Sequence, residues 1–508
     1  MRGAHTRALF FSCIYLIGQK MIEQTNQLRL SRIARVGVTL ALAAVLAACA
    51  NYAGIHSDKE MAQPQTYTTQ QSLPADDDRW PAPDWADQFG DAQLRALLDE
   101  ALRGSPTLEQ ARARIAAASA YSETARANAM PQVGASYSWT RPRYSENALV
   151  PPPYAGSWQS ENKGLLSASY ELDLWGKNRE ALRAAVSQVQ ASRADAEAVR
   201  LALDASIARS YNQLARLYAL RDIAQNEVGE RERIVRITAG RIANGLDSEV
   251  ERKTADADLA SSRATLAALE GGIVTTRYQI AALLGEGPDR GLSIERPHLG
   301  IGDEVRLPGN LPADLVSRRP DLVAARWRVD SMTHEIKEAK AEFYPDINLS
   351  ATLGLDAFGF GRLLTAASRT MSAGPAIHLP IFDGGALRAQ LKGRYADLDY
   401  AVATYNQTLV TALSDVATNL SQIRSTDAQL ADASAAQDAA HGAQQLALTQ
   451  YRAGLANQLT VLNAETNALA AERAVANLKM DRRDQQIALA AALGGGYTDT
   501  SADAIAAR

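Results

Sequence analysis

The sequence is poor in several features whose scarcity excludes whole classes of protein. Only two cysteines occur, Cys13 and Cys49, and neither stands at the spacing of a zinc site or a redox motif. The six histidines are scattered without catalytic or metal-ligand spacing. The formal net charge of −4 provides no basic excess for nucleic acid. We therefore expect no metal, no nucleic-acid partner and no enzymatic activity.

Long apolar runs are also scarce, and the one near the N-terminus predicts export. Arg29, Arg32 and Arg35 precede the run 36–48, which is too short to span a bilayer but suits a secretory signal peptide. We predict that residues 1–48 are a signal region, with Met21 a better start than Met1. Aromatic residues amount to 6% against 46% hydrophobic residues, and the abundant alanine favours long helices.

The signal region ends in Leu46-Ala47-Ala48-Cys49, which resembles the lipobox of bacterial lipoproteins. The resemblance implies cleavage before Cys49 and a covalent lipid on this cysteine, and no other cofactor is expected. A plain signal peptide cleaved nearby is the alternative. Ala50 follows where an aspartate would imply retention in the inner membrane, so the outer membrane is the expected destination. Residues 49–84 are polar, and we predict an extended tether.

The rest of the chain contains two copies of one pattern. Pro106 recurs as Pro320, and Pro131 recurs as Pro345, each 214 residues later. Three glycines recur at a common displacement of 209 residues: Gly176, Gly245 and Gly285 as Gly385, Gly454 and Gly494. Two copies are too few for a stacked solenoid, so we infer an internal duplication.

Each copy predicts a β-hairpin, then a very long helix and then a shorter one. The helices are predicted because long proline-free stretches place apolar residues three, four or seven apart. Repeat 1 (85–287) is predicted to contain a helix, a hairpin (132–175) and helices over 177–244 and 247–284. Repeat 2 (312–493) is predicted to contain a helix, a hairpin (346–383) and helices over 386–453 and 456–493. An equatorial segment (288–311) and a C-terminal tail (494–508) complete the chain. We expect 247–284 to lie end to end with 313–344, matching a long helix in length.

The hairpin segments alternate apolar and polar residues. Val133, Ala135, Tyr137 and Trp139 share one face of the first strand, and similar alternation occurs in the other three. Soluble sheets alternate likewise, but these hairpins are inserted between helices with no other core to cover them, which favours lipid. In a bilayer only a closed barrel satisfies every backbone group. Four strands are too few for a barrel, so copies must combine, and three copies give 12 strands.

Several motifs resemble those of the TolC-like outer membrane factor family, in its NodT-type lipoprotein branch. They are the opening from Trp85 to Leu98, the segment Tyr170-Glu171-Leu172-Asp173-Leu174-Trp175-Gly176, and Pro380-Ile381-Phe382-Asp383-Gly384-Gly385. The resemblance covers residues 46–496. It implies a mainly α-helical subunit whose homotrimer forms a 12-strand transmembrane β-barrel continuous with a periplasmic α-helical barrel.

The resemblance also implies that two helical turns form the far end of the tube and meet a periplasmic adaptor protein. The residues that match these tips are Arg241, Gly245, Leu246, Arg452, Gly454 and Leu455. Glycine suits the left-handed cap where a helix must stop and reverse. The alternative is that the two leucines merely cover their turns.

Four further residues are candidates for the periplasmic aperture. Relatives close it with charged residues, but Asn463 occupies the matching position here and Thr466 follows it, so a charged latch is in doubt there. Asp247 and Glu249 lie near the other tip and would ring the entrance with negative charge. Charged residues at helix starts are usually caps, and we favour that role.

The predicted function is that of an outer-membrane channel subunit in a tripartite efflux system. The chain would be lipid-anchored in the outer membrane, extend into the periplasm and serve an inner-membrane transporter indirectly, through the adaptor. The transporter selects the cargo, and the resemblance implies compounds such as antibiotics or aromatic acids of the fusaric acid type. The alternatives are the outlet of a type I protein-secretion system and a periplasmic coiled-coil scaffold, which needs neither amphipathic strands nor a lipid.

Overall fold

In the computed structural model, the chain is described over residues 52–69, 71–73, 80–147, 150–300 and 311–499. These residues form two compact units. The first unit contains the segment up to Asp58 and residues 123–184 and 332–398. The second contains residues 59–122, 185–331 and the chain from Asp399 onward. Cys49 and the predicted signal region lie outside the described residues.

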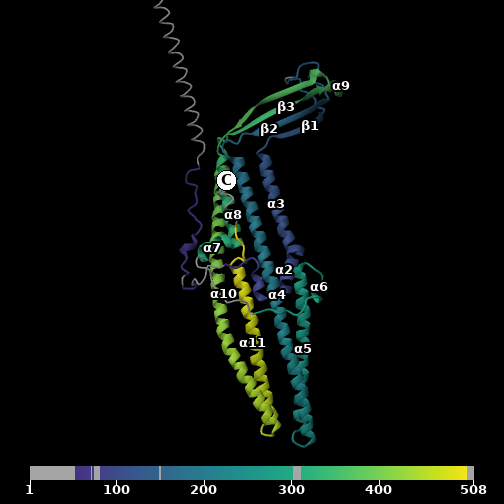
Figure 1. The fold of residues 1–508 in the computed structure, drawn as a ribbon. Helices are drawn as coiled ribbons and strands as arrows, with labels where there is room; N and C mark the ends of the chain where they lie inside the picture. The colour runs from purple at the N-terminus through teal and green to yellow at the C-terminus, as the bar shows by residue number, and fades with distance from the viewer. Residues whose placement is uncertain (1–51, 70, 74–79, 148–149, 301–310, 500–508) are drawn as a thin grey trace, which may run out of the picture. The chain divides into compact units, whose positions relative to one another are not determined.

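The first unit holds one antiparallel sheet in the order β1-β2-β3-β4 (Figure 1). Its strands are β1 (Gln132–Thr140), β2 (Glu161–Glu171), β3 (Asp346–Phe358) and β4 (Arg369–His378). The two predicted hairpins are joined because β2 pairs with β3 from Glu161 to Glu171. β1 and β4 each have one neighbour, so the sheet has two edges. The short helix α9 (Phe360–Leu363) lies between β3 and β4.

An apolar face crosses the whole sheet. The register places Ala135 opposite Leu166, Leu166 opposite Leu353, and Leu353 opposite Met371. Leu166, Leu353 and Met371 are exposed, as are Val133 and others on the same face. The alternation predicted from the sequence is therefore observed, although β2 ends at Glu171, before Leu172 and Leu174.

The base of the sheet is fixed by aromatic contacts. Trp175 stacks on Tyr344 with ring centroids 4.7 Å apart, and its Nε1 donates to the Pro345 carbonyl over 2.9 Å. Tyr52 meets the edge of Phe343 at 5.5 Å. Ile55 is buried in the same cluster as Phe343 and Leu391. The start of the predicted tether is therefore packed against this unit instead of being an extended spacer.

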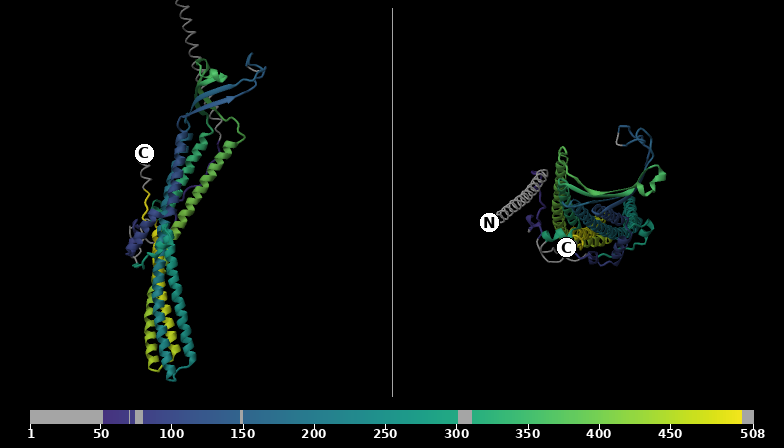
Figure 2. Two further views of the ribbon diagram at one scale, coloured as in Figure 1. Left: turned by 90° about the vertical axis from the view of Figure 1, so that its right-hand side faces the viewer. Right: turned by 90° about the horizontal axis from the view of Figure 1, so that it is seen from above.

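The helices follow the predicted order. They are α2 (Ala92–Gly104), α3 (Pro106–Asn128), α4 (Lys177–Ala243), α5 (Glu249–Leu284), α6 (Pro288–Leu292), α7 (Leu311–Arg318), α8 (Pro320–Ala341), α10 (Ala386–Arg452) and α11 (Gln458–Ala492). α4 and α10 each end one residue before the predicted boundary. In the second unit the α4–α5 and α10–α11 hairpins lie side by side in two perpendicular views (Figure 2). Within the described ranges, no helix combines the length and apolarity needed to cross a membrane.

One expectation about helix pairing is wrong. A Cβ atom on Gly285, at the end of α5, would lie 2.5 Å from the Gly104 carbonyl oxygen and 2.6 Å from Pro106. A Cβ atom on Gly494, at the end of α11, would collide with the Arg318 carbonyl oxygen. α5 therefore meets the start of α3, and α11 meets the start of α8. Segment 247–284 was expected to lie end to end with 313–344, but it abuts α3 of its own repeat. Gly285 makes this possible, because it has no side chain to block the close approach.

The core of the second unit lies where α2 packs against the long helices. Phe89, Leu94 and Tyr211 are fully buried there, together with Ile280 of α5 and Ile487 of α11. The segment after α6 is fastened by Arg483, whose guanidinium donates to the carbonyls of Leu299 and Gly300 over 2.7 and 2.6 Å. The C-terminal tail is described to Asp499, whose amide donates to the Ser317 carbonyl. Both connecting segments are thus held by the helices.

Candidate adaptor-docking site at the hairpin tips

The two predicted tips form the same turn. Gly245 and Gly454 both have left-handed backbones, with φ of +72° and +75°. In the first turn, Gly245 N donates to the Ile242 carbonyl and Leu246 N donates to the Arg241 carbonyl, each over 2.9 Å. The second turn repeats both bonds with Gly454 and Leu455 as donors. This double-bonded cap satisfies the last helical carbonyls, so each long helix stops without burying a polar group.

Each tip exposes two apolar side chains. Leu246 and Leu455 are 65% and 80% exposed, so neither leucine covers its turn. Val250 and Leu459, four residues further on in the first turns of α5 and α11, are also exposed. Sequence analysis missed this second pair, although Val250 and Leu459 are 209 residues apart like the glycines. The four side chains, Leu246, Val250, Leu455 and Leu459, are called the tip residues below.

The inner side of the two tips is held by a network between hairpins. Arg241 forms a two-pronged ion pair with Asp247, with nitrogen–oxygen distances of 2.8 and 3.2 Å. The Arg241 guanidinium also lies 4.6 Å from the ring centre of Tyr451, which is 1% exposed. Burial and the Asp247 carboxylate raise the pKa of Tyr451, so its hydroxyl stays protonated and donates to Asp247 over 3.3 Å. Arg241 and Asp247 thus join the two hairpins to each other.

The remaining predicted residues lie apart from this network. Glu249 begins α5 and pairs with Arg252 over 2.6 Å, next to a capping box formed by Ser248. Asn463 and Thr466 are exposed on α11, and Thr466 donates to the Leu462 carbonyl. Arg452 is exposed and forms no ion pair within the described part of the chain. The cap of α5 is therefore made by Ser248 and Glu251, with Glu249 beside it as an acidic residue of the first turn. Asp247, for which a cap was also expected, pairs with Arg241 instead.

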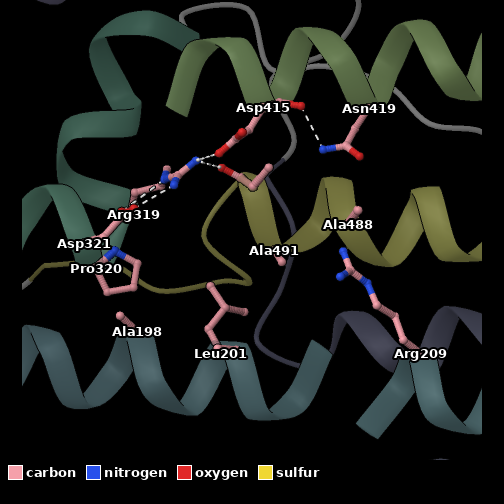
Figure 3. A pocket seen from close by; sticks show the side chains of 12 residues that line it. Ala198, Leu201, Arg209, Arg319, Pro320, Asp321, Asp415, Asn419, Ala488 and Ala491 are labelled. Atoms are coloured by element: carbon pink, nitrogen blue, oxygen red, sulfur yellow. Dashed lines mark hydrogen bonds and ion pairs between the residues drawn. The ribbon is translucent and has the colours of Figure 1, made fainter. Parts of the chain in front are cut away.

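A separate hollow lies where the end of α11 meets α8 and α10. It has a volume of about 370 Å³ and is lined by residues that include Leu201, Arg209, Arg319 and Asp415. Figure 3 shows Arg319 turned toward Asp321 and Asp415, to which it is bonded over 2.6 and 3.3 Å. Two carboxylates thus neutralise the Arg319 guanidinium, and a second arginine, Arg209, also lines the hollow. We regard this hollow as a helix junction.

Among the described residues, no cluster of three or more His, Cys, Asp or Glu side chains is arranged to hold a metal ion. Each tip thus presents exposed apolar side chains on a capped turn.

The family description "Outer membrane efflux protein" matches residues 97–286 and 311–495, which include both tips and all four strands of the sheet. The chain belongs to this efflux protein family. The multidrug resistance outer membrane protein MdtP of Shigella flexneri is 32% identical over 432 residues, covering 82% of this chain and 87% of MdtP. The fusaric acid resistance protein FusA of Burkholderia cepacia is 40% identical over 318 residues, covering 61% of this chain and 59% of FusA. That second match spans less than two thirds of the relative.

Solved structures of outer-membrane channels have the same fold. The outer membrane protein VceC of Vibrio cholerae is 36% identical, with a TM-score of 0.77 over 82% of this chain and 100% of VceC. The outer-membrane channel OprN is 28% identical, with a TM-score of 0.78 over 87% and 97% of the two chains. The predicted fold class is confirmed: this is the subunit fold of a trimeric channel with a β-barrel and an α-helical barrel. The efflux protein family places the chain in the outer membrane.

Proposed function

We propose that three copies of this chain form one duct that carries small toxic molecules across the periplasm and outer membrane. The sheet is the observation that supports three copies most directly. Its two edges leave backbone groups unpaired, and its exposed apolar face needs lipid. Three such sheets joined edge to edge supply 12 strands and remove every edge.

The partner proposed for the tips is a periplasmic adaptor that links the duct to an inner-membrane transporter. The four tip residues are solvent-exposed on capped turns, so a partner could remove their apolar surface from water. An amphipathic helical hairpin presents an apolar stripe that could cover these exposed side chains, and it is the kind of partner that fits. The inner network of Arg241, Asp247 and Tyr451 has the separate task of closing the two hairpins on each other.

We also propose a covalent lipid on Cys49. Tyr52, three residues later, packs on Phe343 and lies 3.5 Å from the Tyr344 hydroxyl at the base of the sheet. A lipid there would enter the same membrane as the strands.

The proposed cargo comprises antibiotics and aromatic acids of the fusaric acid type. The support is the names of the two relatives, MdtP and FusA, and the cargo is selected by the transporter. A polypeptide cargo, as in type I secretion, is the competing proposal, and no feature of the described residues favours it.

A deletion strain tests the whole proposal. The strain is complemented with wild-type protein or with Cys49→Ser and challenged with antibiotics, fusaric acid and dyes, while its secreted proteins are compared. We expect the deletion strain to lose resistance to at least one small compound while its protein secretion stays unchanged. The wild-type protein should form outer-membrane trimers that stay intact on detergent gels when the sample is not boiled. Normal resistance with altered secretion would favour the protein outlet, and a protein without trimers or barrel behaviour would favour the scaffold.

A further inference from the structure

A buried charged cluster lies between the two hairpins, above the tips. Glu465 of α11 is 1% exposed and Arg231 of α4 is 8% exposed, and the Glu465 Oε2 and Arg231 Nη1 atoms are 3.1 Å apart. Long charged side chains are rarely buried this deeply without full pairing. The groups around them come from all four helices: Glu227 and Glu230 of α4, Asp258 of α5, Gln444 of α10 and Arg473 of α11.

The cluster contains more carboxyl groups than guanidinium groups. Arg473 is committed to Glu227, with a distance of 2.5 Å. Arg231 is shared, since it also lies 3.8 Å from Asp258 and 4.0 Å from Glu227. Glu230 accepts from the uncharged amide of Gln444 over 2.9 Å and forms no ion pair with an arginine or lysine of the described residues. Four carboxyl groups thus share two guanidiniums, and ionising all of them would leave two unmatched negative charges between the helices.

Glu465 is the carboxyl group whose ionisation costs most. Neither of its oxygens accepts a hydrogen bond, and Arg231 Nη1 donates none, so the pair is close but poorly aligned. A buried carboxylate without donors loses its hydration and receives little in return. Burial above all, and then Glu230, raise the pKa of Glu465 to about 8 from its ordinary 4.5. A protonated Glu465 has the donor that Glu230 can accept.

We propose that Glu465 and Glu230 form a proton-binding site that is occupied when the two hairpins are packed together and emptied when they separate. Glu465 belongs to the α10–α11 hairpin and Glu230 to the α4–α5 hairpin, so separation exposes both carboxyl groups to water. Binding of the proton thereby stabilises the state in which the two hairpins are packed together. The proposal rests on the proposed function, because only an assembled duct has an entrance for these hairpins to close.

The direction of the pH effect follows from linkage. The packed state holds a proton on Glu465 up to about pH 8, whereas the separated state loses it near the ordinary value of 4.5. Packed hairpins thus bind more protons across that window, and their stability falls as pH rises through it. Above about pH 8 both states have lost the proton, so the stability of the packed state no longer changes with pH through this group. Acidic conditions keep the entrance closed, and rising pH favours its opening by up to about tenfold per pH unit for each subunit.

The experiment measures the conductance of the purified trimer in planar lipid bilayers from about pH 5 to about pH 9. We expect wild-type conductance to increase with pH across this range. Glu465→Gln keeps the shape of the side chain but cannot ionise, so its conductance should depend much less on pH. Glu472→Gln is the matched control, because Glu472 lies on the same helix and takes no part in the cluster. It should respond like the wild type.

Glu230→Gln supplies a second variant in case Glu465→Gln fails to assemble, and trimers on unboiled gels report assembly. Loss of the pH response in either assembled variant supports the site. A full response in both variants, or a flat wild-type response in a conducting channel, would overturn the inference and leave the proposed function intact. If wild-type protein forms no channel at any pH, the proposed function itself fails.

Discussion

The two helical hairpins share one turn and differ in what holds it in place. Both stop a long helix at a left-handed glycine and expose two apolar residues at positions 209 residues apart. The α4–α5 hairpin closes with a capping box at Ser248 and carries Arg241 and Asp247. The α10–α11 hairpin is capped by Asn457 and contributes Tyr451. The exposed tip residues of the two hairpins are thus alike. Their inward residues differ, because Arg241 and Asp247 of one hairpin contact Tyr451 of the other.

This difference separates two tasks. Similar outward residues let one kind of partner engage both hairpins, since each presents the same apolar spacing. Dissimilar inward residues let the hairpins recognise each other, because charge from one meets an aromatic ring and a hydroxyl from the other. The following variants test whether the tasks are independent.

The largest effect is expected from charge on the outward residues. Leu246→Glu combined with Leu455→Glu should reduce resistance to the level of a deletion strain, because a buried carboxylate would lie in the adaptor contact. Each single glutamate variant should lose less resistance, since its other tip is unchanged and can still contact the adaptor. Resistance to toxicants and trimers on unboiled gels are the measurements. The double methionine variant is the control and should retain resistance. A fully resistant double glutamate variant would show that the tips do not dock the adaptor.

A smaller effect is expected from the inward network. Asp247→Asn removes the charge that Arg241 pairs with and should weaken hairpin packing by about 1–2 kcal/mol. Conductance of the isolated trimer should rise while adaptor binding persists. Glu249→Gln is a matched control, because its pair with Arg252 is exposed and contributes about 0.5 kcal/mol or less. Equal conductance in the two variants would contradict a closing role for Asp247.

The smallest effect is expected from the caps. Ser248→Ala and Asn457→Ala should each cost about 1 kcal/mol, because each removes an acceptor from one helix start. Hydrogen exchange in the intact trimer should accelerate at the amides of Val250 and Thr460, respectively. The two hairpins should lose similar stability, which would show that different caps are equivalent. Exchange that changes at only one hairpin would show that the turns are unequally supported.

Sequence reasoning succeeded where a pattern had one physical meaning. The proline-free stretches fixed the long helices to within one residue at α4 and α10, and the alternation of Val133 to Trp139 identified the apolar face. It failed for the helix that lies end to end with α5, because the two candidates are nearly equal in length. α3 has 23 residues and α8 has 22, so length alone cannot choose between them. It also could not identify Glu465, since a glutamate in a polar helix is expected on the surface.

The glycine contacts at Gly285 and Gly494 have a mechanical consequence. α4 and α10 continue past these points with unbroken hydrogen bonding, whereas their neighbours are divided into pieces that only abut. A continuous helix resists bending along its whole length, but two abutting helices are joined by van der Waals contact and a few capping bonds. We therefore expect flexing to concentrate at these two junctions, one in each repeat, each positioned by a residue that has no side chain.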